Sequence, residues 1–161
     1  MRLVKFLIIS ALVLASIITA ISFLFPSKVV VSRAIEISAP AENIAYYVSD
    51  LQHWNAWMTE WKENKVTIKD STAFISTQTI RLVQKTDSSA RFNWVATGQP
   101  PYDVLIEWLP LSNNQYVIHW SFTQNVHWYP WEKFQTLLNE KLLGYKMEVE
   151  LANLKEAILN K

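Results

Sequence analysis

Four consecutive runs between residues 79 and 123 alternate bulky and polar side chains with a period of two residues. Successive side chains of a β-strand point to opposite faces, so each run predicts a strand with one buried and one solvated face. The runs TIRLVQKT, ARFNWVATG, YDVLIEWL and QYVIHWSFT are separated by turn-like segments, and a further strand-like run, TAFIST, precedes them. The pattern predicts an antiparallel meander. Its buried face would carry the even-numbered residues Ile80, Leu82, Phe92, Trp94, Ala96, Tyr102, Val104, Ile106, Trp108, Tyr116, Ile118, Trp120 and Phe122.

The segment before the meander predicts a strand and two short helices. KVVVSRAIEIS is rich in β-branched residues and predicts a strand over residues 29–37. The Ala-Pro pair at residues 39–40 opens a first helix, and Asp50 ends it and caps the second. A single stripe at helical spacing runs along this second helix and consists of Leu51, Trp54, Trp57 and Trp61.

A long helix is predicted over residues 131–159, which completes an α+β fold. Gly144 lies in mid-helix, where glycine costs about 1 kcal/mol relative to alanine, so we expect another group to approach closely there. The helix carries a wide apolar arc, as expected for a helix that lies across a sheet. This arc has two stripes, one of Phe134, Leu138, Leu142, Tyr145, Val149 and Ala152, and a neighbouring one of Met147, Leu151, Leu154 and Ile158.

The N-terminus predicts a membrane anchor. Residues 6–27 contain no charged side chain across 22 positions, and about 20 apolar residues span a bilayer as a helix. A cleavable signal peptide, with an apolar region of about 7–15 residues, is the alternative. Arg2 and Lys5 precede the span, so the positive-inside rule predicts a single-pass protein with a cytoplasmic N-terminus. Residues 1–27 would be the anchor, and residues 28–161 would form an extracytoplasmic domain close to the membrane surface.

Composition and motifs exclude several classes of protein. The formal net charge is +1 and no basic stripe stands out, so nucleic acid is not an expected partner. Cysteine is absent, which excludes disulfides and thiolate metal sites, and two glycines cannot build a phosphate-binding loop. The three histidines show no metal-ligand spacing, and no nucleophile motif is present. We therefore expect no metal, no cofactor and no catalytic residue, and an enzyme is the less favoured reading.

Three stretches resemble the START-like superfamily, also called the polyketide cyclase/dehydrase or SRPBCC group. VSRAIEISAPAENIAYYVSDLQHWNAW resembles its opening strand, first helix and Asp-Leu-x-x-Trp-x-x-Trp segment. QYVIHWSF resembles its last strand, and GYKMEVELANLKEAI resembles its C-terminal helix. The resemblance covers roughly residues 28–161. It implies a helix-grip fold, in which a curved antiparallel sheet packs on a long C-terminal helix with a cavity for apolar ligands between them. The group includes carriers, enzymes and chaperone cofactors, so the fold leaves the function open.

The residues expected at such a cavity come from three parts of the sequence. In the implied fold the short helices close one end of the sheet, so Trp54 and Trp57 would face inward as core or cavity wall. Trp61, at the end of the segment, is the best candidate of the three for exposure. Arg33 would either bind an acidic head group or reach the strand end and meet solvent or a surface carboxylate, because an inward arginine without a partner is costly. The aromatic residues of the even face either fill the interior or line a pocket, and they are Trp94, Tyr102, Trp108, Tyr116, Trp120 and Phe122.

The favoured function is a membrane-tethered domain that binds an apolar or lipid-like small molecule. One alternative is a cyclase- or hydrolase-type enzyme, for which the even face offers chiefly Tyr102 and Tyr116 as polar groups. The other is a ligand-free module that acts through an unknown protein partner. The segment HWYPW, residues 127–131, either enters the membrane interface and frames a ligand entrance, or packs over the first turn of the long helix.

Overall fold

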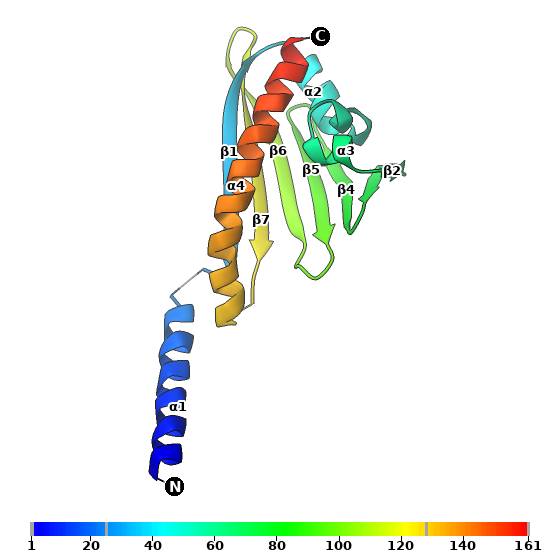
Figure 1. The fold of residues 1–161 in the computed structure, drawn as a ribbon. Coiled ribbons are helices and arrows are strands. Elements are labelled where there is room, and N and C mark those ends of the chain that lie inside the picture. Colours follow the sequence, from blue (N-terminus) through cyan, green and yellow to red (C-terminus); the bar gives the residue numbers. More distant parts are fainter. Residues whose placement is uncertain (1, 25, 128, 161) are drawn as a thin grey trace.

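A curved antiparallel sheet and one long helix across its face make up most of the structure (Figure 1). The computed structural model describes residues 2–24, 26–127 and 129–160, apart from the side chains of residues 134–139. Within these residues, seven strands pair in the order β1-β7-β6-β5-β4-β3-β2. The strands are β1 (Lys28–Ser38), β2 (Val66–Lys69), β3 (Thr72–Ile75), β4 (Gln78–Lys85), β5 (Ser89–Ala96), β6 (Tyr102–Ser112) and β7 (Gln115–Asn125). The helices are α1 (Arg2–Ser22), α2 (Ala41–Ser49), the 3-10 helix η1 (Leu51–Ala56), α3 (Thr59–Glu63) and α4 (Pro130–Leu159).

The predicted α+β helix-grip architecture is confirmed. The opening strand and all five meander runs are strands, and every neighbouring pair is antiparallel. Strand β2 was not predicted, because its four residues are too few to show a clear alternation. Its two apolar side chains, Val66 and Ile68, are half-buried and pack against the core. The burial of these two side chains favours the addition of β2 to the edge of the sheet.

The period of two in the meander correctly identifies the buried face. Even-numbered side chains of β5, β6 and β7 point to α4 and the short helices, and most of them are fully buried. The odd-numbered face is wetter and carries charge pairs between strands, such as Arg91 with Asp103 at 3.5 Å. The most deeply buried large side chains of the core include Trp54, Trp57, Trp108, Trp120, Phe92, Ile106 and Ile118.

The tryptophan segment forms two short elements in place of the single helix that its stripe predicted. Helix η1 begins as expected, with an Asp50 carboxylate oxygen that accepts a hydrogen bond from the Gln52 backbone N–H at 2.9 Å. The chain then becomes extended at Met58, which separates η1 from α3. Trp61 is the most accessible of the three tryptophans, as expected, but at 6% exposure it is still buried in the core. The break at Met58 changes the direction of the chain, so helical spacing does not describe where Trp61 points.

Helix α4 buries one of its two predicted apolar stripes and exposes the other. Met147, Leu151, Leu154 and Ile158 are all buried in the core. In the other stripe, Leu142 and Tyr145 are 72% and 71% exposed, and Val149 is also exposed. Ala152 is exposed as well, and the side chains of residues 134 and 138 lie outside the described residues. The sheet covers the helix from one side only, so a wide apolar arc cannot be buried across its whole width.

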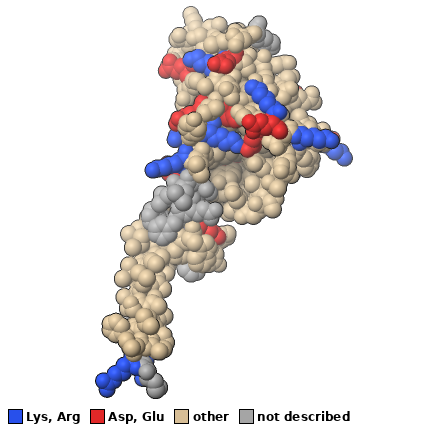
Figure 2. Space-filling view, viewed as in Figure 1, with Lys and Arg blue, Asp and Glu red and all other residues tan. Residues whose placement is uncertain are grey.

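Helix α1 stands apart from the sheet and takes no part in the core. It is long and apolar enough to cross a membrane, by length and composition, and a signal sequence has the same character. Figure 2 shows an uncharged surface along this helix, with basic side chains at the N-terminal tip, where the sequence places Arg2 and Lys5. The hydrophobic core begins only at β1, so its packing does not depend on α1.

Candidate functional site: a cavity between the sheet and the long helix

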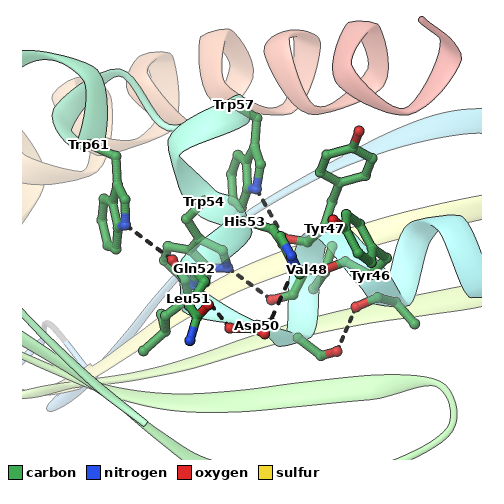
Figure 3. Close-up of polar contacts among 12 residues, drawn as sticks. Tyr46, Tyr47, Val48, Asp50, Leu51, Gln52, His53, Trp54, Trp57 and Trp61 are labelled. Atoms are coloured by element: carbon green, nitrogen blue, oxygen red, sulfur yellow. Dashed lines mark hydrogen bonds and ion pairs between the residues drawn. The ribbon is translucent and has the colours of Figure 1, made fainter. Parts of the chain in front are cut away.

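The tryptophan segment is structural. Figure 3 shows its indole rings turned toward the turn between α2 and η1, where each N–H finds a backbone carbonyl. Trp54 donates to the Val48 carbonyl at 3.0 Å, and Trp57 donates to the Tyr47 carbonyl at 3.1 Å. Trp61 donates to the carbonyl of Leu51 at 3.2 Å. The three rings therefore fix the short helices against each other, and none of them lines the cavity described next.

A cavity of about 260 Å³ lies between the sheet and the middle of α4. The sheet side is mostly aromatic, and the helix side combines apolar and charged residues. Leu142, which is largely exposed, stands at the edge of the cavity, so the space opens to solvent there. The lining residues are Met58, Gln78, Trp94, Ala96, Gln99, Tyr102, Trp120, Phe122, Leu142, Leu143, Lys146, Met147 and Glu150.

Four of the predicted aromatic site residues meet in this cavity, and the remaining predicted residues lie elsewhere. The four are Trp94, Tyr102, Trp120 and Phe122. Trp108 is buried in the core and donates to the Asp87 carbonyl at 3.0 Å. Tyr116 is half-buried at the far end of β7, opposite Ile37 of β1. The enzyme hypothesis required Tyr102 and Tyr116 to lie close together, and the structure keeps them apart.

Arg33 does not line the cavity either. Its guanidinium Nε donates to a carboxylate oxygen of Glu148 on α4 at 2.6 Å, and its Nη1 donates to the Ser32 carbonyl at 2.8 Å. The guanidinium covers Gly144, because a Cβ at this position would collide with Nη2 and would lie 2.8 Å from Cζ. The close approach expected at this glycine is confirmed. Of the two alternatives for Arg33, the structure shows the surface carboxylate.

Tyr102 supplies a hydroxyl on the sheet side of the cavity. Burial raises the pKa of Tyr102, and a side-chain hydrogen bond with Gln124 partly offsets this increase. A phenol with a pKa of about 10 or above is protonated at neutral pH, so the Tyr102 hydroxyl can both donate and accept a hydrogen bond. Gln124 is itself held by the Pro100 carbonyl, to which its amide donates at 2.8 Å.

The polar residues contributed by α4 were missed by sequence analysis, although a signal was present. Leu143, Lys146, Met147 and Glu150 follow the i, i+3, i+4, i+7 spacing of one helix face. A search for apolar residues alone does not find this face, because two of its four residues are charged. The Lys146 ammonium forms an ion pair with Glu60 of α3, and this contact ties α4 to the short helices.

The buried carboxylate of Glu150 is the most constrained polar group of the cavity wall. Its two oxygens lie 3.1 and 3.0 Å from the backbone nitrogen of Thr59, at the start of α3. The Asn153 side-chain amide donates to the same carboxylate at 3.3 Å and to the Trp57 carbonyl at 3.2 Å. Within the described residues, no group of three or more histidine, aspartate or glutamate side chains is arranged to hold a metal ion. The site is therefore a largely apolar cavity with a few fixed polar groups.

Comparison with known proteins identifies the fold. No family model and no curated protein matches the sequence. A START superfamily protein from Mycobacterium smegmatis superposes with a TM-score of 0.62 at 14% sequence identity, over 81% of this chain and 97% of that one. The chain has the START-like helix-grip fold. CalU16 from Micromonospora echinospora shares this fold with a TM-score of 0.58 at 14% identity, over 81% of this chain and 84% of that one.

A larger protein shows the same START-like fold over part of its length. DynU16, from the dynemicin biosynthetic locus, matches with a TM-score of 0.56 at 12% identity. The match covers 79% of this chain but only 46% of DynU16. At such identities the similarity describes the fold and leaves the function open.

Proposed function

We propose that this protein is a membrane-tethered binding protein for an apolar or lipid-like small molecule. The single observation that carries the proposal is the cavity of about 260 Å³ between the sheet and α4. Aromatic and apolar walls with a few placed polar groups are typical of sites for small molecules, whose volumes run from about 300 to 1,000 Å³. The cavity is slightly smaller than this range, which favours a compact ligand.

The tether would hold the cavity at a defined height above the membrane. Helix α1 ends at Ser22 and β1 begins at Lys28, so the connection between them is short. The Val126 backbone N–H donates to the Ser27 carbonyl at 2.9 Å, which holds the end of this connection beside the segment that leads into α4. Lys146 lies 16 residues beyond Pro130, so at 1.5 Å per residue the cavity is about 24 Å along α4 from its first residue. A ligand would therefore leave the bilayer to enter the cavity.

Copurification tests this proposal directly. Full-length protein would be purified in detergent, and its bound molecules would be identified by native mass spectrometry and solvent extraction. A cavity-filling variant, Ala96→Leu, should lose the bound molecule, because Ala96 lines the cavity. The matched control Ala152→Leu adds the same atoms on the exposed side of α4 and should keep it. Protein without a bound apolar molecule, or equal occupancy in Ala96→Leu, would contradict the proposal.

The orientation of the tether can be tested because the chain lacks cysteine. We propose that the N-terminus is cytoplasmic and that the sheet lies on the other side of the membrane, since Arg2 and Lys5 precede the span. A single cysteine at the exposed Asn113, in the turn between β6 and β7, provides a label site far from the cavity. In intact cells, a membrane-impermeant maleimide should label Asn113→Cys without permeabilisation. Labelling only after permeabilisation would reverse the proposed orientation.

The aromatic segment before α4 is proposed to contact the membrane surface. The rings of Tyr129 and Trp131 stack with centroids 4.9 Å apart, and Trp131 is 65% exposed in the first turn of α4, a helix that contacts α1. Position 128 lies outside the described residues. None of the described residues of this segment lines the cavity, so the structure does not support the expectation that the segment frames a ligand entrance. Amphipathic aromatic residues favour the headgroup region of a bilayer.

Liposome binding by a fragment of residues 28–161 tests this contact, because the hydrophobic core lies within that fragment. Trp131→Ala should weaken binding several-fold, whereas the control Tyr145→Ala removes an exposed aromatic residue farther along α4 and should not. A fragment that does not bind liposomes, or equal effects of the two substitutions, would show that the segment merely packs over the first turn of α4.

A further inference from the structure

The indole N–H of Trp120 is a buried donor beside the cavity. Trp120 lines the cavity and is only 2% exposed, and its Nε1 meets no hydrogen-bond acceptor among the described residues. The other buried tryptophans each have one. Their acceptors are the carbonyls of Val48 for Trp54, Tyr47 for Trp57, Leu51 for Trp61 and Asp87 for Trp108, and the amide oxygen of Gln78 for Trp94.

Neighbouring rings hold the Trp120 indole in place. Trp57 packs against it edge-to-face, with centroids 5.6 Å apart, and Phe122 lies on another side at 5.3 Å. A ring packed in this way cannot easily turn to reach a distant acceptor. A buried donor without a partner is unfavourable, and Trp120 lines the cavity, which has room for a foreign acceptor. Less than 1 Å² of Nε1 itself is accessible, so such an acceptor reaches the N–H only when the side chains that cover it move.

The charges around the cavity discriminate against an anionic ligand. Glu150 contributes a buried carboxylate to the wall. Lys146 is the cation of the wall, and it is already paired with Glu60. An anion in the cavity would therefore lie near a fixed carboxylate without a free counter-charge, and it would also lose its hydration. An uncharged molecule avoids both penalties.

We propose that the ligand is an uncharged, mainly apolar molecule with an oxygen acceptor, such as a ketone, ester or amide carbonyl, that receives a hydrogen bond from Trp120 Nε1. This inference rests on the proposed function and makes it more specific. It assigns Trp120 the role of a specificity-determining residue, which distinguishes a carbonyl compound from a hydrocarbon or a carboxylate of the same shape.

Three naphthalenes of nearly equal size separate these possibilities. 2-Acetylnaphthalene carries the carbonyl, 2-isopropenylnaphthalene replaces its oxygen with a CH₂ group, and 2-naphthoate carries a charged carboxylate. Their dissociation constants would be measured by titration calorimetry on full-length protein in detergent micelles, with partition into protein-free micelles subtracted. Wild-type protein should bind the ketone about three- to tenfold more tightly than the alkene and at least tenfold more tightly than the carboxylate.

Two variants assign the preference to one N–H group. Trp120→Phe should abolish the preference of the protein for the ketone over the alkene. The matched control Trp94→Phe also removes a cavity indole, but the N–H of Trp94 already donates to Gln78 at 2.7 Å, so the preference should remain. A measurement on wild-type protein, the NMR resonance of the Trp120 indole N–H, tests the proposal even if Trp120→Phe does not fold. The ketone, but not the alkene, should shift the Nε1–H resonance of Trp120 downfield, with the resonance assigned through contacts to Trp57 and Phe122.

The outcomes distinguish this inference from the function on which it rests. Equal binding of ketone and alkene, or equal shifts of the Trp120 resonance, would overturn the inference and leave a cavity that binds apolar molecules. Tighter binding of 2-naphthoate than of the ketone would overturn the requirement for an uncharged ligand. If neither neutral naphthalene binds, both the inference and the proposed function are wrong.

Discussion

The effect of Gly144→Ala on the free energy of unfolding should depend on whether Arg33 is present. We expect the substitution to stabilise the protein without Arg33 and to be neutral or destabilising with it. In mid-helix the substitution alone stabilises a protein by about 1 kcal/mol, because alanine is the better helix former. Here the new Cβ would collide with the Arg33 guanidinium, whose Cζ lies 2.8 Å from that position. The guanidinium must therefore move away, and its contacts with Glu148 and the Ser32 carbonyl would be disturbed.

The magnitude follows from these two contacts. The ion pair joins side chains that are 35% and 57% exposed, so solvent screening limits its contribution to about 0.2–1 kcal/mol. The hydrogen bond to the Ser32 carbonyl contributes about 0.5–1.5 kcal/mol. Against the gain of about 1 kcal/mol in helix propensity, Gly144→Ala should be close to neutral or destabilising in the wild-type background. In an Arg33→Ala background the collision is absent, and the same substitution should stabilise by about 1 kcal/mol.

A double-mutant cycle measures this difference. Urea unfolding of the full-length protein in micelles, followed by tryptophan fluorescence, would give the free energy of unfolding for wild type, both single variants and the double variant. The coupling energy between Arg33 and Gly144 should be about 0.7–2.5 kcal/mol, the sum of the two disturbed contacts. Additive effects within about 0.3 kcal/mol would refute the reasoning, because they would show that Arg33 does not rest on Gly144 in solution.

Two further predictions concern single positions. Since the pKa of Tyr102 is raised in the folded protein, the folded state holds this proton longer than the unfolded state, and stability should fall as pH rises from about 10 toward the raised value. Tyr102→Phe should make this alkaline decline less steep in urea titrations at several pH values. The exposed control Tyr145→Phe should keep the wild-type slope, and an unchanged slope in Tyr102→Phe would contradict the assignment. On α4, Leu154→Ala should lower the free energy of unfolding by about 2–5 kcal/mol and Leu142→Ala by less than about 0.5 kcal/mol, because only Leu154 is buried. Equal losses would mean that the exposed stripe is covered in solution.

The meander was predictable because its signal comes from backbone geometry alone. Side chains of a strand alternate between two faces whatever the rest of the chain does, so the period of two identified the buried face of β5, β6 and β7. The edge strand β2 was missed because it forms by adding to β3, and four residues carry little pattern of their own.

The apolar arc of α4 was not sufficient to predict which side of the helix is buried. Both stripes have helical spacing, and the choice between them depends on the position of the sheet. The structure buries the stripe with Leu151 and Leu154 and leaves the one with Leu142 and Tyr145 exposed. Gly144 was the more informative residue, because its helix penalty had to have a local cause, and the cause is the Arg33 guanidinium.

Strand register explains why only some even-numbered aromatic residues reach the cavity. Tyr102 begins β6 and, on β7, Phe122 and Trp120 stand opposite the next even positions of β6, so these three residues share one end of the buried face. Trp108 lies one buried row beyond Trp120, and Tyr116 lies another row beyond that, toward the end of the sheet where Figure 1 shows α2. All five residues have the same parity and similar chemistry, so the alternation that predicted their common face could not separate them. Position along the strand decides which of the five residues reach the cavity, because the short helices fill one end of the sheet and leave space beneath α4 at the other.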